Sequence, residues 1–468
     1  MTTEPELCDL AATVLARMLR DREVSAREVL QAHLRRIETV NPAVNAIVTL
    51  VPEVAAARAA EADDAIARGE PLGPLHGLPI AIKDLVATAG IRTTAGSPIF
   101  AHAVPVEDDL LAERVRAAGA LLLGKTNTPE FGAGSQTFNP VFGATRNPHD
   151  PTKTSGGSSG GAAAALATGM IPIADGSDLG GSLRNPASFC GVVGFRPSPG
   201  RVPSWPTTNA WDDLSVDGPM GRSVEDAALL LSALAGPDKR IPISLPEPGQ
   251  TFAPPLDTDL GAPVVAWAPA ADSRMPFDPV VPAIVDASRP AFEALGCRTE
   301  EAFPDLTDAR EIFFTFRAHG YAADLGELLA EHRNEIKATV VWNIEEGLKL
   351  TQADLARAAR LRTDLGARVA AFYQRFDYLV MPVSQVPPFD VELEYPTEIG
   401  GLPMPTYLDW MESCWCITVM GGPAISMPCG FTADGLPVGL QIVGRRGDDI
   451  GVLRLAFAFE RARLGAAA

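Results

Sequence analysis

Apolar and polar residues follow one another along this chain in blocks that predict strands and helices in turn. Three short, almost continuously apolar runs have the length and composition of buried strands; they lie at 78–83, 120–123 and 171–174. Segments with a helical spacing of apolar residues separate and follow them, at 107–118, 158–169 and 222–235. Strands that alternate with helices are typical of a largely parallel α/β sheet.

The two ends of the chain are predicted to be helical. Residues 6–40 predict two helices, and the second begins at a capping box in which Ser25 is followed three residues later by Glu28. The alanine-rich segment 53–69 predicts a third helix, and 447–464 predicts a C-terminal one.

A proline-rich stretch at 241–263 predicts a loop that leads into the second half of the chain. Strands are expected there at 264–267 and 378–381, with helices near 279–295 and across 307–372. No linker-like break divides the chain, so we predict one large α/β domain. Its central, mostly parallel mixed sheet is expected to carry helices on both faces.

Length and composition favour a soluble enzyme. Of the 468 residues, 46% are hydrophobic, enough for a large core, yet no apolar run is long enough to span a membrane. Acidic residues (Glu4, Glu6, Asp9) stand where a signal peptide would need positive charge. The six cysteines show no disulfide or metal-ligand spacing, so we expect a reduced, cytoplasmic chain without a metal site. We also expect no cofactor. The net charge of −19 disfavours nucleic acid as a partner.

The segment 154–201 holds two serine sites flanked by glycines, GGSSGG at 156–161 and GGS at 180–182. Glycines beside a serine leave backbone N–H groups uncovered, so a reacting oxygen can approach them closely. A serine nucleophile and its oxyanion hole need that geometry. We therefore predict Ser182 as a nucleophile.

This segment resembles the amidase signature family, serine hydrolases of C–N bonds that use a Ser-cisSer-Lys triad. After GGSSGG come a small-residue helix, DLGGSLRNPA at 178–187 and GFRP at 194–197, which match the family pattern. The likeness covers most of the chain and thins at 236–375. Its other stretches are GLPIAIKD at 77–84, GKTNTPEF at 124–131, FGATRNP at 142–148, DGPMGRSVEDAALLL at 217–231 and PAISMPCGFTADGLPVGLQIVGR at 423–445.

The resemblance implies that Lys83 deprotonates Ser158, the cis-serine, which takes the proton of Ser182 as that residue attacks a carbonyl. Ser158 then passes a proton to the departing amine, and water completes deacylation. Four backbone N–H groups would hold the oxyanion, those of Leu179, Gly180, Gly181 and Ser182. Three further residues are expected to support these groups without reacting: Ser177, Asp178 and Arg184.

A lysine base also makes physical sense here, because no histidine lies near either serine site in the sequence. Lys83 ends the apolar run LPIAIK, where burial would disfavour its charged form. Lowering its pKa from about 10.4 to about 7 requires roughly 4–5 kcal/mol of environmental bias. Desolvation of a buried amine supplies a free energy of that size.

Two other motif matches compete with this interpretation. The phosphate-loop expression fits 119–126, but its interior reads as a strand and no helix follows it. The nucleophile-elbow expression fits 157–161, yet no strand precedes it, and only His319 and His332 remain downstream to complete an α/β-hydrolase triad. We expect neither motif to operate.

The sequence constrains the substrate less than the reaction. By alignment with the family, the stretch Phe131, Gly132, Ala133 and Gly134 should lie beside the nucleophile and leave room for a bulky group. Aromatic residues gather in the stretches that vary most between family members, and some of them should line a pocket. They are Trp205, Trp211, Phe313, Phe314, Phe316, Tyr321, Trp342, Trp410 and Trp415.

We therefore expect a free-standing amidase, a monomer or homodimer that hydrolyses aryl or acyl amides or carbamates, similar to aryl-acylamidases and to nylon-oligomer and urethane hydrolases. The alternative is the amidase subunit of a tRNA-dependent amidotransferase. We expect four parts in the domain: N-terminal helices at 1–70, a catalytic core at 71–235, a variable substrate-pocket region at 236–375 and a C-terminal return to the core at 376–468.

Overall fold

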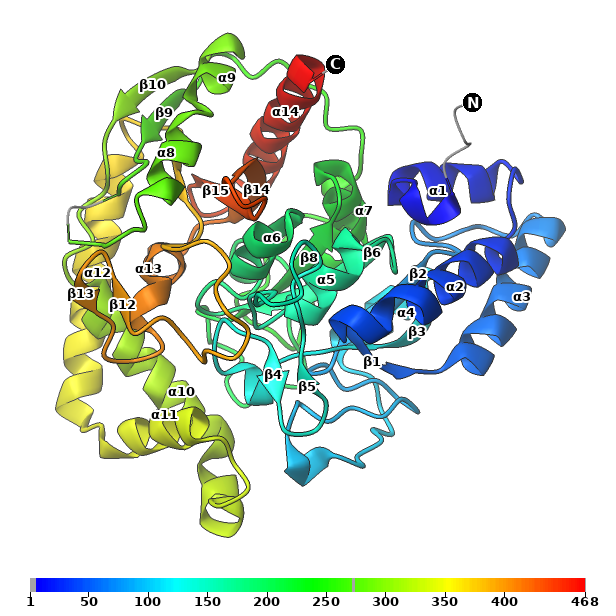
Figure 1. Ribbon diagram of the computed structural model, residues 1–468, viewed down its shortest axis with the longest axis horizontal. Helices are drawn as coiled ribbons and strands as arrows, with labels where there is room; N and C mark the ends of the chain where they lie inside the picture. Colours follow the sequence, from blue (N-terminus) through cyan, green and yellow to red (C-terminus); the bar gives the residue numbers. More distant parts are fainter. Residues whose placement is uncertain (1–5, 272–273, 468) are drawn as a thin grey trace.

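Short aliphatic segments from both halves of the chain build the central sheet of the computed structural model, which describes residues 6–271 and 274–467 (Figure 1). In that described part the sheet has eight strands. In spatial order they are β10 (Arg298–Glu301), β9 (Val264–Trp267), β11 (Tyr378–Pro382), β15 (Pro437–Gly444), β14 (Ala424–Phe431), β7 (Val193–Arg196), β8 (Val216–Gly221) and β6 (Ile173–Asp178).

The sheet is mixed, as predicted, but it is not mostly parallel. Only two of its seven neighbouring pairs are parallel, β10 with β9 and β9 with β11; the other five are antiparallel. Parallel neighbours require a long crossover, usually a helix. Here β14 and β15 are joined by a tight turn, and no helix lies between β7 and β8.

Helices cover both faces of this sheet. Side chains along a strand point alternately to opposite faces of the sheet. Two glycines of β15, which lie on opposite faces of this buried strand, show that each face packs against a helix. Gly439 lies against Ser188 of α6 (Arg184–Cys190), whereas Gly444 lies against Val452 of α14 (Asp449–Ala467). The predicted single α/β domain with a two-sided helical cover is confirmed.

Two of the three strands predicted first belong to a separate, smaller sheet. It has the order β1 (Ile47–Leu50), β3 (Leu121–Thr126), β2 (Pro79–Lys83), with β2 parallel to β3 and β1 antiparallel to it. The backbone N–H of Lys83 at the end of β2 donates to the Asp175 carboxylate on β6, 3.0 Å away. That bond ties the small sheet to the large one.

The N-terminal helices form as the sequence predicts. Ser25 accepts a hydrogen bond from the Glu28 N–H and Glu28 accepts one from Ser25, so the capping box is present. Figure 1 shows these helices beside the small sheet, on the opposite side of the molecule from α10–α12. They are α1 (Ala12–Arg20), α2 (Ala26–Val44) and α3 (Pro52–Arg68), preceded by a short 3₁₀ turn at Leu7–Asp9.

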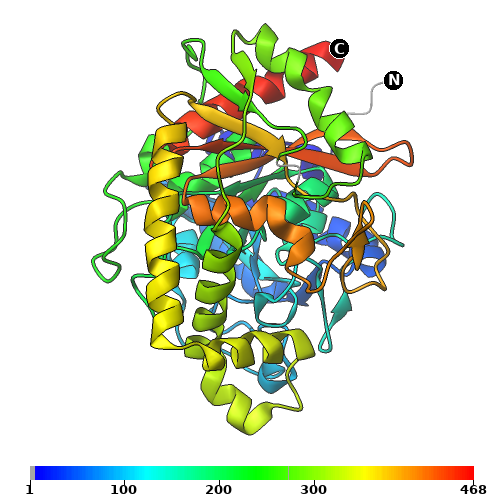
Figure 2. The ribbon, with the colours of Figure 1, turned by 90° about the vertical axis from the view of Figure 1, so that its left-hand side faces the viewer.

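The predicted helical region 307–372 forms three helices, α10 (Ala309–His332), α11 (Ala338–Lys349) and α12 (Gln352–Phe372). In Figure 2, α10 and α12 stand side by side and α13 (Glu412–Met420) crosses near their upper part. The helices α10 and α11 pack closely because Gly347 has no side chain; a Cβ there would lie 2.0 Å from the Ala318 carbonyl oxygen.

The other elements connect these layers. The remaining helices are α4 (Leu110–Ala117), α5 (Gly160–Ala167), α7 (Val224–Leu234), α8 (Val280–Asp286) and α9 (Arg289–Ala294). Short strand pairs join β4 (Phe138–Asn139) to β5 (Gly143–Ala144) and β12 (Glu398–Ile399) to β13 (Leu402–Pro403). Further 3₁₀ turns lie at Pro98–Phe100, Glu130–Gly132, Gly249–Phe252 and Asp409–Met411.

The structure also bears on the phosphate-loop match and on the absence of membrane-spanning segments expected from the sequence. The end of the phosphate-loop match, 124–126, lies inside the buried strand β3, where no irregular loop opens a helix. Across 6–271 and 274–467, none of the helices combines the length and apolar character needed to cross a bilayer.

Candidate active site

The candidate site forms where one strand end, one glycine-rich loop and one strand-to-helix turn meet. Lys83 is the last residue of β2, a strand whose five residues are all buried. Ser158 lies in the loop before α5, after a cis peptide bond between Gly157 and Ser158. Ser182 lies in the turn between β6 and α6.

The amine of Lys83 is surrounded by serine hydroxyls. Its Nζ lies 2.7 Å from Ser158 Oγ, 2.9 Å from Ser159 Oγ and 2.9 Å from Ser177 Oγ. As an ammonium it donates to all three oxygens, whereas a neutral amine has a lone pair that can accept from one hydroxyl. The shortest contact, to Ser158, is suited to that exchange.

Burial acts strongly on this amine because the Lys83 side chain is fully enclosed. Desolvation lowers the pKa of Lys83 to about 8, although the carboxylates of Asp175, Asp217 and Asp178 pull it upward. A pKa of about 8 leaves an appreciable neutral fraction near neutral pH. The expectation that the apolar strand 78–83 buries this lysine is confirmed.

A buried charge cluster holds the turn that carries Ser182. The guanidinium of Arg184 binds both carboxylate oxygens of Asp178, each at 3.0 Å, and Arg196 binds the same carboxylate. Burial alone would raise the pKa of Asp178, but the two guanidiniums outweigh it and hold that pKa far below its ordinary value. Asp178 in turn accepts from the N–H groups of Gly181 and Leu183, at 2.9 and 3.3 Å.

That arrangement changes the predicted oxyanion hole in one respect. The N–H of Gly181 is engaged by Asp178, so it is not available to an incoming oxygen. In the described chain, the N–H groups of Leu179, Gly180 and Ser182 donate to no protein acceptor, and these three residues line the cavity. The local sequence shows four candidate donors but not which way each one points.

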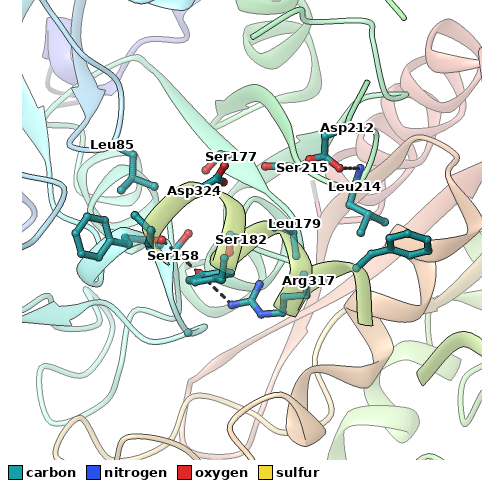
Figure 3. Close-up of a pocket in the computed structure, with 18 of the residues that line it drawn as sticks. Leu85, Ser158, Ser177, Leu179, Ser182, Asp212, Leu214, Ser215, Arg317 and Asp324 are labelled. Atoms are coloured by element: carbon teal, nitrogen blue, oxygen red, sulfur yellow. Dashed lines mark hydrogen bonds between the residues drawn. The ribbon is translucent and has the colours of Figure 1, made fainter. Parts of the chain in front are cut away.

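The serines open into a cavity of about 310 Å³ (Figure 3). Of the stretch 131–134, which was predicted to lie beside the nucleophile, Phe131, Gly132 and Gly134 line the cavity, whereas Ala133 is buried against Ile336 and Val340. A side chain at Gly132 would come within 3.7 Å of Ser158 Oγ. The stretch 131–134 therefore lies beside the serines, but the side chain of Ala133 packs into the core.

Most of the aromatic residues singled out in the sequence pack elsewhere. Phe316 and Tyr321 line the cavity. Phe313 stacks on Trp415 with ring centroids 5.2 Å apart, and this pair lies behind Gly180. Trp211, in contrast, is 69% exposed. The expectation that some of these aromatic residues line the pocket is therefore met by Phe316 and Tyr321.

Comparison with known proteins places the whole chain in a family. Residues 28–453 match the Amidase family.

The chain belongs to the amidase signature family.

An acylamidase of Rhodococcus erythropolis is 37% identical to this amidase over 98% of the present chain and 97% of the relative. One component of a glutamyl-tRNA(Gln) amidotransferase from Synechococcus sp. is 34% identical, with 97% and 96% covered. Among solved structures, a bacterial aryl acylamidase of the amidase signature family superposes with a TM-score of 0.88 at 28% identity, covering 97% and 96%. The amidase is an enzyme that hydrolyses amide C–N bonds.

Sequence reasoning missed several residues that shape the site of this amidase. Ser159 contacts Lys83 directly, and Asp175 binds the Lys83 backbone from 92 positions away. Arg196 adds a second cation to Asp178. The second serine of GGSSGG was a visible signal for Ser159. No local pattern could have paired Lys83 with Asp175, because that contact depends on how the two sheets meet.

Replacement of Asp178 by Asn should destabilise the amidase strongly. The substitution leaves the buried guanidiniums of Arg184 and Arg196 without their carboxylate. We expect it to lower the free energy of unfolding by about 3–5 kcal/mol. The matched change Asp257→Asn removes an exposed pair with Arg461 and should cost less than about 1 kcal/mol. Denaturant unfolding measures both, and equal losses would contradict the assigned role of the buried cluster.

Proposed function

We propose that this enzyme hydrolyses acyl and aryl amides, and carbamates, through an acyl-enzyme on Ser182 with Ser158 and Lys83 as its proton relay. The observation that carries the proposal is the buried Lys83 amine 2.7 Å from Ser158 Oγ, at a cavity that Ser158 and Ser182 both line. A base, an intermediate hydroxyl and a second, more exposed hydroxyl are the groups that a relay of this kind needs.

In the proposed reaction, neutral Lys83 accepts the proton of Ser158, and Ser158 accepts the proton of Ser182 as its oxygen attacks the carbonyl. The N–H groups of Leu179, Gly180 and Ser182 stabilise the oxyanion that forms. Collapse of this intermediate breaks the C–N bond, and Ser158 gives its proton to the departing amine. Water then attacks the ester on Ser182 by the same path and releases the acid.

Support for acyl and aryl amides comes from the cavity wall and from the relatives. Phe131, Phe316 and Leu179 give the wall apolar surface beside the serines. The relatives include proteins named acylamidase and aryl acylamidase. The same oxyanion donors and the same protonation of a leaving amine serve carbamates, so we include them.

The second candidate is the glutamine-hydrolysing component of a tRNA-dependent amidotransferase. Relatives from such amidotransferases are 34–36% identical across nearly the whole chain, which supports this alternative. The two candidates differ in what the purified chain does alone. A free amidase turns over simple amides, whereas the amidotransferase component shows weak glutaminase activity at most.

We further propose that the enzyme acts alone on small molecules, as a monomer or homodimer in the cytoplasm. Its six cysteines are all buried, unpaired thiols, which suits a reducing compartment. Its net charge of −19 gives nucleic acid no attractive surface on average.

The assignment of the nucleophile can be tested by covalent labelling. A fluorophosphonate should label Ser182, and Ser182→Ala should abolish the labelling. Ser158→Ala should leave slow labelling, because the nucleophile survives without its proton acceptor. Ser232→Ala, on α7 and outside the residues that line the cavity, serves as the matched serine control. Peptide mapping that finds the label on Ser158 or Ser159, with Ser182 untouched, would overturn the assignment.

The lysine base predicts a specific pH profile. Because the reactive amine is neutral, kcat/KM should rise with pH along a limb whose apparent pKa is about 8. Lys83→Ala should lower kcat/KM by about 100- to 10,000-fold. Lys83→Arg should not restore activity, because a guanidinium does not deprotonate; the exposed Lys349→Arg is the control. An active Lys83→Arg enzyme would refute the mechanism.

A substrate panel tests the proposed function itself. The purified chain should hydrolyse acyl nitroanilides and aryl carbamates with higher kcat/KM than acetamide or glutamine, because the cavity offers apolar contact to an aryl group. Rates for all four classes should be measured on one preparation. If glutamine led the ranking, the amidotransferase alternative would replace this proposal.

A further inference from the structure

One wall of the cavity contains a buried positive charge. Arg317, on α10, is 5% exposed, and it lines the cavity together with Ser158 and Ser182. In Figure 3 its guanidinium lies on the same side of the view as Ser182, opposite Asp212 and Ser215. A cation in that position can contact whatever occupies the cavity.

Protein groups accept hydrogen bonds from only some of the N–H donors of the Arg317 guanidinium. Nε donates to Asn343 Oδ1 at 3.2 Å, and Nη2 donates to the hydroxyls of Tyr321 and Tyr407, at 3.2 and 2.7 Å. Within the described residues, Nη1 has no hydrogen-bond partner. An arginine carries five N–H donors in a planar fork, so two of them remain free at the edge of the cavity.

No carboxylate neutralises Arg317 in the described chain, and this distinguishes it from the other buried arginines there. Arg184 and Arg196 pair with Asp178, and Arg201 pairs with Asp449. A buried charge without a counter-ion is costly. Aromatic rings relieve part of that cost, since the guanidinium lies 4.7 Å from the ring centre of Tyr321 and 5.7 Å from that of Tyr407.

The acidic residues that line the cavity do not neutralise the charge of Arg317. Asp324 accepts a hydrogen bond from the Thr208 hydroxyl, and Asp212 accepts one from the Leu214 N–H at 3.2 Å. Neither carboxylate forms an ion pair with Arg317 among the residues that the structure covers. The guanidinium is therefore held in place by neutral groups, while its charge remains uncompensated.

We propose that Arg317 binds a carboxylate of the substrate, so that the enzyme prefers amides that carry a free acid group. This proposal rests on the amide hydrolysis proposed above and narrows its substrate class. The carboxylate accepts from Nη1, which has no acceptor in the described chain, and supplies the missing negative charge. Charge-assisted bonds of this kind are among the strongest that a binding site makes.

A purely structural role for Arg317 makes a different prediction. Its bonds to Asn343 and Tyr407 connect α10 to α11 and to the segment before α13. If the side chain served only to hold these elements together, its loss would impair all substrates alike. Binding of a carboxylate instead predicts a loss that depends on the charge of the substrate.

The test uses two pairs of anilides that differ only in a carboxylate and its methyl ester. One pair carries the acid on the acyl side, N-phenylsuccinamic acid and its ester. The other carries it on the leaving amine, 4-acetamidobenzoic acid and its ester. The native enzyme should favour the acid in one pair by about 10- to 100-fold in kcat/KM.

Arg317→Gln should remove that preference, with the acid losing far more activity than the ester. The matched variant Arg362→Gln, on the neighbouring helix α12, removes an arginine that already pairs with Asp213 at 2.7 Å and should leave the preference intact. Equal losses for acid and ester, or no preference for the acid by the native enzyme in either pair, would overturn the proposal. The native measurement decides even if Arg317→Gln fails to fold.

Binding measurements separate this proposal from the proposed function. Calorimetry on Ser182→Ala, with and without Arg317→Gln, reports the affinity for each acid and ester without turnover. Arg317-dependent binding of the acids with no hydrolysis of any amide would refute the proposed function alone. Hydrolysis of the anilides without any preference for the acids would refute the carboxylate site alone.

Discussion

Burial of the Lys83 amine is the constraint around which the site is organised. An amine enclosed at the end of a buried strand must find hydrogen-bond partners without water. Three serine hydroxyls provide them, and the backbone is arranged to admit these groups. A Cβ on Gly176 would lie 2.6 Å from Ser159 Oγ, so only glycine lets that serine reach its place. The same burial gives the amine a pKa at which it can act as a base.

The buried charge of Asp178 is neutralised by arginine partners, whereas the buried charge of Arg317 has no carboxylate partner among the described residues. Asp178 lies between two guanidiniums and fixes the turn of Ser182 through backbone N–H groups. Arg317 faces the same cavity without any such partner among the described residues. Neutralised charges of the first kind maintain geometry, whereas a charge held only by neutral groups is free to interact with a ligand.

The two halves of the chain contribute different parts of the site. Lys83 and the two serine segments, all within the first half, bring together the groups of the proposed proton relay. The helix α10 of the second half adds a wall to the cavity through Phe316, Arg317 and Tyr321. Close packing of α11 against α10 at Gly347 supports that wall.

The sequence by itself determined the buried strand that ends at Lys83, the Ser25 capping box, the α/β class and the family, because burial pattern, caps and motifs are encoded locally. Only the tertiary structure decided strand direction, the engagement of the Gly181 N–H and the inward turn of Ala133. It also decided that Arg317 has no acidic partner within the described chain. These features depend on contacts between residues far apart in the chain, and periodicity along the sequence carries no information about such pairings.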